Sequence, residues 1–258
     1  MKLAGVCGLP MQPDGTALTA SPISPINQPA GEQELKFHVP RTASLAFRQW
    51  LDLTFQRHSR HAVSTICTIY YDTPEGISFL EKAASDYHKT KYRVRWYADG
   101  EGRPLTVPAF VEVKEKHGVV RRKYRQPIAV PATELMTLPF HHPTLMKVFQ
   151  RHLPEAAPQP PARLRPVLEL RYRRHRYRHP LFRETFCLDS DIRCVRTHGG
   201  SLPAAQGLVL PHDVFEQKGL AQDPLPLLQA LPRFGARRAS LSKYFLTVLQ
   251  LLPHSRYS

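Results

Sequence analysis

The sequence predicts an α+β fold in which eight mostly antiparallel strands form a β tunnel or barrel, with flanking helices and a C-terminal helix. Eight segments alternate polar and apolar residues or are rich in β-branched and aromatic residues, as strands are. They are mostly sequential, which suits antiparallel pairing, and eight strands are a common number for a closed barrel. No internal repeat or second hydrophobic core is visible, so we expect one domain over residues 32–258.

The strands are assigned from alternation and composition. In EQELKFHV, which begins at Glu32, the side chains of Glu34 and Lys36 share one face of the strand. VSTICTIYY is β-branched and aromatic, and two later strands are joined across His117 and Gly118 as a tight hairpin. In chain order the expected strands are Glu32–Val39, Val63–Tyr71, Lys91–Tyr97, Phe110–Lys116, Val119–Gln126, Val167–Arg178, Glu184–Asp189 and Leu208–Lys218.

Helical segments lie between and after these strands. The first has apolar residues near one side and Thr42 or Ser44 as its cap, and the last is amphipathic with Ser240 or Ser242 as its cap. The helical segments are Ala43–His58, a short stretch after Pro74, Pro143–Leu153 and Ser240–Leu252.

Residues 1–31 are expected to form a disordered tail, because they hold five prolines among small and polar residues and show no hydrophobic period. The four cysteines, Cys7, Cys67, Cys187 and Cys194, have no CxxC spacing and are expected to be reduced thiols. No apolar stretch approaches the roughly 20 residues that span a bilayer. No apolar segment precedes Cys7 as a signal peptide requires, so a cytoplasmic location is expected.

The charge indicates a polyanionic partner, because 36 Lys and Arg against 21 Asp and Glu give a formal charge of +15. The charges lie on the polar faces of the expected strands, while alternate residues such as Val94 and Trp96 are apolar. Spacing allows these faces to point outward, as an ordinary solvated sheet, or inward, as a cationic tunnel suited to phosphates and a divalent metal. The charged faces carry Arg93 and Arg95; Glu112, Lys114 and Lys116; Lys123 and Arg125; Tyr172, Arg174 and Arg176; and Glu216 and Lys218.

Eight motifs in order resemble the VTC domain, the polyphosphate polymerase domain of the vacuolar transporter chaperone complex and its bacterial relatives. That family belongs to the CYTH-like triphosphate tunnel metalloenzymes, whose fold is an eight-stranded antiparallel tunnel with flanking helices. The resemblance covers essentially residues 32–250. The motifs are ELKF (34–37), TIYYDTP (68–74), KYRVRWY (91–97), FVEVKEK (110–116), PVLELRYRR (166–174), RETFCLD (183–189), VFEQKG (214–219) and SLSKY (240–244).

The resemblance implies a role for each matching residue. Glu216 resembles the carboxylate that binds the divalent metal cofactor, Mg or Mn. Arg93 and Arg95 match an RxR pair whose planar guanidinium groups can grip phosphates. Roles at the reacting phosphates are implied for Arg93, Arg95, Arg174 and Lys243. Phosphate or nucleotide binding is implied for Lys36, Lys114, Tyr172, Arg183 and Lys218, and the charged strand face adds Lys123.

The resemblance implies an enzyme that moves the terminal phosphate of ATP onto inorganic polyphosphate, and alternatives remain open. Glu32 stands where VTC domains often carry Arg and begins the ExExK signature of the wider triphosphatase branch, so an inorganic or nucleoside triphosphatase is a rival. A nucleic-acid-binding module is another, because residues 163–178 hold seven Arg interleaved with Tyr172 and Tyr177. We expect nucleic acid less than polyphosphate, since no recognised binding motif is present. A non-catalytic polyphosphate sensor is the third.

Overall fold

The computed structural model describes residues 26–27, 33–59, 61–105, 107–118, 120–181, 184–205, 207–220, 224–240 and 242–252. All eight expected strands are present as long antiparallel strands. They are β2 (Gln33–Pro40), β4 (Val63–Asp72), β5 (His88–Ala98), β6 (Ala109–His117), β7 (Val120–Ile128), β8 (Arg165–Arg178), β9 (Thr185–Thr197) and β10 (His212–Gly219).

The sheet contains three short strands that the sequence did not reveal, so it has eleven strands in place of eight. Each short strand has two residues, and such brief pairings leave no alternation to detect. They are β1 (Ile26–Asn27), β3 (Gln56–Arg57) and β11 (Arg237–Arg238), which pair with β7, β8 and β2. Within the segment expected to be disordered, β1 is the part that the structure describes.

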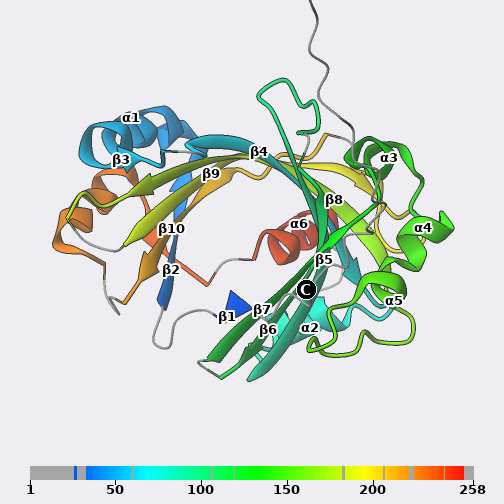
Figure 1. Cartoon of the computed structure of the whole chain (residues 1–258). Coiled ribbons are helices and arrows are strands. Elements are labelled where there is room, and N and C mark those ends of the chain that lie inside the picture. Colours follow the sequence, from blue (N-terminus) through cyan, green and yellow to red (C-terminus); the bar gives the residue numbers. More distant parts are fainter. Residues whose placement is uncertain are drawn as a thin grey trace, which may run out of the picture.

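The sheet is a strongly curved arch, and in this respect the expectation of a closed barrel is wrong. Its strand order is β1-β7-β6-β5-β4-β8-β9-β10-β2-β11, with β3 beside β8. Among the described residues no ladder joins the β1 edge to the β11 edge. Figure 1 shows the arch, with the last helix beneath it and the other large helices outside.

Helices pack on both faces of the arch. Helix α6 (Lys243–Leu251) begins where expected, and the Ser242 side chain accepts a hydrogen bond from the Phe245 amide (3.4 Å) as its cap. The expected first helix is shorter, because the chain enters β3 after it and pairs with β8. The remaining helices are η1 (Arg41–Ala43), α1 (Ser44–Thr54), α2 (Ile77–Ala83), α3 (Ala132–Thr137), α4 (Pro143–Met146), α5 (Val148–His152) and η2 (Pro226–Phe234).

Three hydrophobic clusters hold these layers together. The outward residues of β4 to β7, among them Val94 and Trp96, are fully buried with Leu145 and Phe149 of the outer helices. A second cluster joins β4, β8 and β9 to α6, and a third joins β2, β9 and β10 to α1 and η2. Because the apolar side of β5 and β6 is covered by helices, its charged side must face the inside of the arch.

Candidate active site

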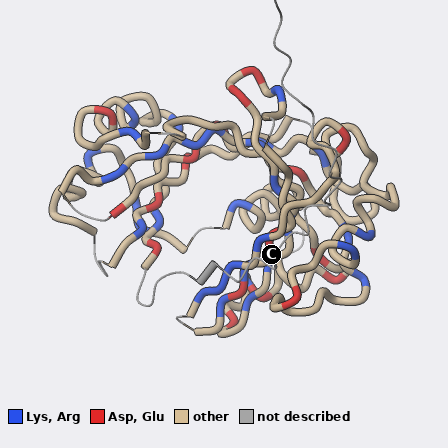
Figure 2. The backbone as a smooth tube through the Cα atoms, viewed as in Figure 1, with Lys and Arg blue, Asp and Glu red and all other residues tan. Residues whose placement is uncertain are grey.

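Two adjoining cavities lie on the inner side of the arch. The larger has a volume of about 570 Å³ and the smaller about 90 Å³, and they share lining residues from β2, β5, β6, β8 and β10. Fourteen Lys and Arg line the larger cavity, against Glu34 and Glu115. Figure 2 shows Lys and Arg on strands of both sides of the arch. The inward orientation, which spacing left open, is therefore the one that the fold adopts.

Ten of the eleven residues expected at the site line these cavities, and the eleventh, Arg183, lies outside the described residues. Tertiary folding brings them together from β2, β5, β6, β7, β8, β10 and α6. The ten are Lys36, Arg93, Arg95, Lys114, Lys123, Tyr172, Arg174, Glu216, Lys218 and Lys243.

Glu112 organises the cations on one side of the site. It is fully buried. One of its carboxylate oxygens accepts a hydrogen bond from Nε of Arg93 at 2.7 Å and lies 2.5 Å from Nη2 of the same guanidinium group. The other oxygen lies 2.8 Å from Nζ of Lys123 and 3.4 Å from Nε of Arg125. Arg125 also stacks on Phe110, with its guanidinium carbon 3.5 Å from the ring centre. Glu112 therefore fixes the positions of several cations at once.

The charge of Glu112 is held by these neighbours. Burial alone would raise the pKa of this carboxyl, but Arg93, Arg95 and Lys123 hold it well below its usual range. Because Arg93 is the close partner of a buried carboxylate, its removal would leave Glu112 underpaired. Removal of Arg93 is therefore expected to destabilise the empty protein as well as to weaken phosphate binding.

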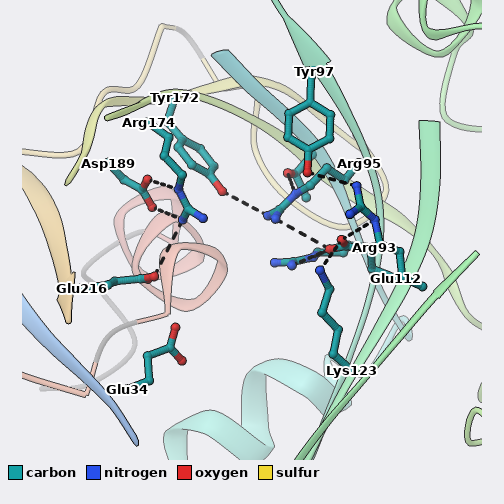
Figure 3. Close-up of polar contacts among 12 residues, drawn as sticks. Glu34, Arg93, Arg95, Tyr97, Glu112, Lys123, Tyr172, Arg174, Asp189 and Glu216 are labelled. Atoms are coloured by element: carbon teal, nitrogen blue, oxygen red, sulfur yellow. Dashed lines mark hydrogen bonds and ion pairs between the residues drawn. The ribbon is translucent and has the colours of Figure 1, made fainter. Parts of the chain in front are cut away.

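Asp189 plays the same part on the other side, and the sequence analysis missed it. Its two oxygens accept from Nε and Nη2 of Arg174 at 2.5 and 2.6 Å, and Nζ of Lys243 lies 2.6 Å from one of them. Burial alone would raise the pKa of Asp189. Arg174 and Lys243 lower it by more, so the net shift is downward and the carboxyl is charged. Figure 3 shows this group across the cavity from Glu112. The signal available was an acidic residue at the end of the RETFCLD motif, which carried the resemblance.

Tyr172 lies between the two groups and is almost fully buried. Its hydroxyl accepts a hydrogen bond from Nη2 of Arg95 at 3.1 Å, and its ring faces Nζ of Lys243 at 5.0 Å. Tyr172 therefore orients cations as well as lining the smaller cavity.

Glu216 and Glu34 are held more loosely than the other two carboxylates. The oxygens of Glu216 lie 3.7 Å from Lys36 and Lys243 and 3.8 Å from Arg174, all beyond hydrogen-bond distance. Glu34 lies 3.3 Å from Lys36 and 3.6 Å from Lys218. Burial raises the pKa of Glu216, but these cations lower it well below its usual range, so its charge is retained.

These two carboxylates suit a divalent metal that also binds phosphate oxygens. They are charged, their ion pairs are long, and oxygen donors are those that Mg²⁺ and Mn²⁺ prefer. The described residues contain no group of three or more His, Cys, Asp or Glu able to hold a metal by themselves. A metal here would therefore take its remaining ligands from substrate and water.

Several cavity cations escaped the sequence analysis as site residues. Most of them lie at the ends of strands or on α2, outside the motifs that carried the resemblance. The signal for two of them was the period-2 pattern of β5, which puts Lys89 and Lys91 on the same strand face as Arg93. These additional lining residues are Lys82, Lys89, Lys91, Lys116, Arg121, Arg122 and Arg238.

The aromatic residues that suggested nucleic-acid binding are unavailable to bases. Tyr172 is 2% exposed and Tyr177 is 1% exposed, and the Tyr177 hydroxyl donates to Asp52 at 2.9 Å. A base cannot stack on a ring that is already covered by protein.

Comparisons with known proteins agree with this fold. The model of the VTC domain family matches residues 32–252. The solved structure of HpAC1 from Hippeastrum, described as a candidate adenylyl cyclase with dominant triphosphatase activity, has 14% identity and a TM-score of 0.51. The matched region covers 88% of this chain and 100% of the HpAC1 chain. The solved structure of a candidate adenylate cyclase from Bacillus halodurans has 13% identity and a TM-score of 0.48. The matched region covers 82% of this chain and 95% of the Bacillus halodurans chain.

No curated protein matches this chain. In the described part of the chain, no helix has the length and apolar character needed to cross a bilayer.

Proposed function

The chain belongs to the VTC domain family, and from this premise we propose that it is a polyphosphate polymerase that uses ATP. A terminal oxygen of inorganic polyphosphate attacks the γ-phosphorus of ATP, the bond from that phosphorus to the β–γ bridging oxygen breaks, and ADP leaves with the electron pair. The polyphosphate chain grows by one phosphate.

The observation that carries this proposal is the excess of positive charge in the cavities. Together they are lined by fifteen Lys and Arg against Glu34, Glu115 and Glu216. ATP alone brings about four negative charges, since its α- and β-phosphates carry about one each and its terminal phosphate carries roughly 1.5 to 2. The lining therefore suits a longer polyanion that lies beside the nucleotide's phosphates.

Positioning and charge neutralisation supply most of the catalysis in phosphoryl transfer. Arg93 and Arg95, fixed by Glu112 and Tyr172, would grip phosphate oxygens from one side, and Arg174 and Lys243, fixed by Asp189, from the other. Glu216, with Glu34 beside Lys36, would hold the divalent metal, which when bound neutralises charge on the transferring phosphate.

The test is to incubate the purified protein with γ-labelled ATP and Mg²⁺ or Mn²⁺ and to separate the products on a gel. Long labelled chains that an exopolyphosphatase degrades, with matching ADP, support the proposal. Arg174→Met should abolish chain formation. Arg103→Met is the matched control, because Arg103 is exposed and pairs with Asp99 and Glu101 away from the cavity. A wild type that forms no chains with either metal would contradict polymerase activity.

Hydrolysis of triphosphates is the second candidate. It is supported by the loosely paired Glu34 and Glu216 and by the similarity in fold to a protein described as having dominant triphosphatase activity. In that case water replaces the polyphosphate acceptor, and the same incubation would release orthophosphate without labelled chains.

A further inference from the structure

Lys91 is a cavity cation that the proposed function has not used. It lies on β5 two residues before Arg93, on the same strand face, and it lines both the larger and the smaller cavity. A chain of phosphates that extends from one cavity to the other therefore passes its ammonium group.

The ammonium of Lys91 has a weak partner. Its Nζ donates to Oγ of Ser242 at 3.0 Å, and no carboxylate oxygen of the described residues lies within 4 Å of it. By contrast, Lys36, Arg93 and Lys243 each have a carboxylate partner.

The groups around Lys91 are themselves cations. They include Lys36 on β2, Lys82 on α2, and Lys89 and Arg93 on β5, and Lys114 of β6 is paired with Lys91 across the sheet. Burial first, and then these charges, lower the pKa of Lys91 to about 7. An added anion would stabilise this half-buried ammonium, which neighbouring cations repel.

Two residues shortly before Ser242, whose hydroxyl holds Lys91, contact β2 and α2. Ala239 donates its amide to the Lys36 carbonyl, and Oγ of Ser240 accepts from Lys82 at 3.0 Å. The Ser242 hydroxyl that accepts from Lys91 also caps α6. Ser242 therefore keeps the ammonium at the cavity wall in the absence of substrate.

We propose that Lys91 is a phosphate-binding residue of this site, whose ammonium exchanges the Ser242 hydroxyl for a phosphate oxygen of the substrate. The inference rests on the proposed function and adds to it a residue and the contact that substrate replaces. A charged phosphate oxygen is a stronger acceptor for an ammonium group than a neutral hydroxyl is. The exchange is therefore favourable when triphosphate or polyphosphate enters.

The experiment measures binding of inorganic triphosphate by calorimetry, without metal, to the wild type, Lys91→Met and Lys91→Arg. Loss of a charge-assisted hydrogen bond predicts roughly ten- to hundredfold weaker binding by Lys91→Met. Lys91→Arg, which retains the charge, should recover most of the affinity. The matched control is Lys147→Met, since Lys147 is exposed between α4 and α5 and lines neither cavity.

A second measurement separates binding from folding. Because Lys91→Met removes a half-buried ammonium that neighbouring cations repel, the empty variant should melt no lower than the wild type. Triphosphate affinity of Lys91→Met within twofold of the control would overturn the inference, as would equal losses in Lys91→Met and Lys91→Arg, which would assign the effect to packing. The proposed function fails differently: a wild type that binds triphosphate but makes no polyphosphate leaves the role of Lys91 intact.

Discussion

Replacing Glu112 by Gln should destabilise the empty protein severely while leaving its shape nearly unchanged. The carboxylate is inaccessible to solvent, and its oxygens lie 2.5 Å from Arg93, 2.8 Å from Lys123, 3.4 Å from Arg125 and 3.7 Å from Arg95. The amide of Gln has a similar volume and no charge. The four cations would then face one another without compensation.

The size of the effect follows from these distances. At an effective dielectric constant of about 20, each close pair contributes roughly 4 to 7 kcal/mol before the cost of removing both charges from water. Breaking a buried ion pair by removing one partner costs about 3 to 5 kcal/mol after that cost is included. Because Glu112 serves several cations, we expect the upper end, about 5 kcal/mol. For a domain of this size that lowers the melting temperature by roughly 10 to 20 °C.

Urea and thermal unfolding measure this effect, with Glu101→Gln as the control. Glu101 is 72% exposed in its side chain and pairs with Arg103 at 2.8 Å, so its replacement should change stability by less than about 1 kcal/mol. Inorganic triphosphate should restore part of the loss in Glu112→Gln, about 2.7 kcal/mol at a hundred times its Kd. A Glu112→Gln variant within about 1 kcal/mol of the wild type would refute the view that this carboxylate organises the cations.

Three other perturbations follow from the same geometry. Glu216→Gln should abolish turnover that depends on Mg²⁺ or Mn²⁺ while triphosphate affinity without metal, measured by calorimetry, falls no more than about threefold; wild-type turnover across metal concentrations would contradict this. Burial and neighbouring cations lower the pKa of Lys91 to about 7, and burial lowers that of Lys123 to about 8. Above these pKa values the unfolded state therefore binds more protons than the folded state. Urea unfolding without polyanions should show higher stability near pH 9 than near pH 7, and a decrease would contradict the lowered pKa values. Burial raises the pKa of Asp213 to about 6, so its ionisation destabilises the folded protein as pH rises from about 4 to 6. Asp213→Asn, whose amide oxygen can still accept from Ser44, should match or exceed wild-type stability at pH 8, and a large loss there would show that the charged carboxylate is needed.

The sequence by itself determined the eight long strands and the terminal helix, because these depend on local alternation and capping. It limited the cap of that helix to Ser240 or Ser242, and the structure shows that it is Ser242. It also determined which residues share a strand face, so Arg93 and Arg95, or Glu216 and Lys218, could be grouped from spacing alone. The motifs, together with the charged strand face that carries Lys123, then led to ten residues that line the cavities.

Only the tertiary structure decided which face points inward, because alternation is the same whether the charged side meets water or a cavity. The packing of Trp96 and Val94 under the outer helices settles it. Strand register and helix packing also set the partners: Asp189 meets Arg174 across the β8–β9 ladder and Lys243 from α6, and Glu112 meets Lys123 across the β6–β7 ladder. The open edge of the sheet depends on strand curvature and on contacts between distant segments, which no local pattern encodes.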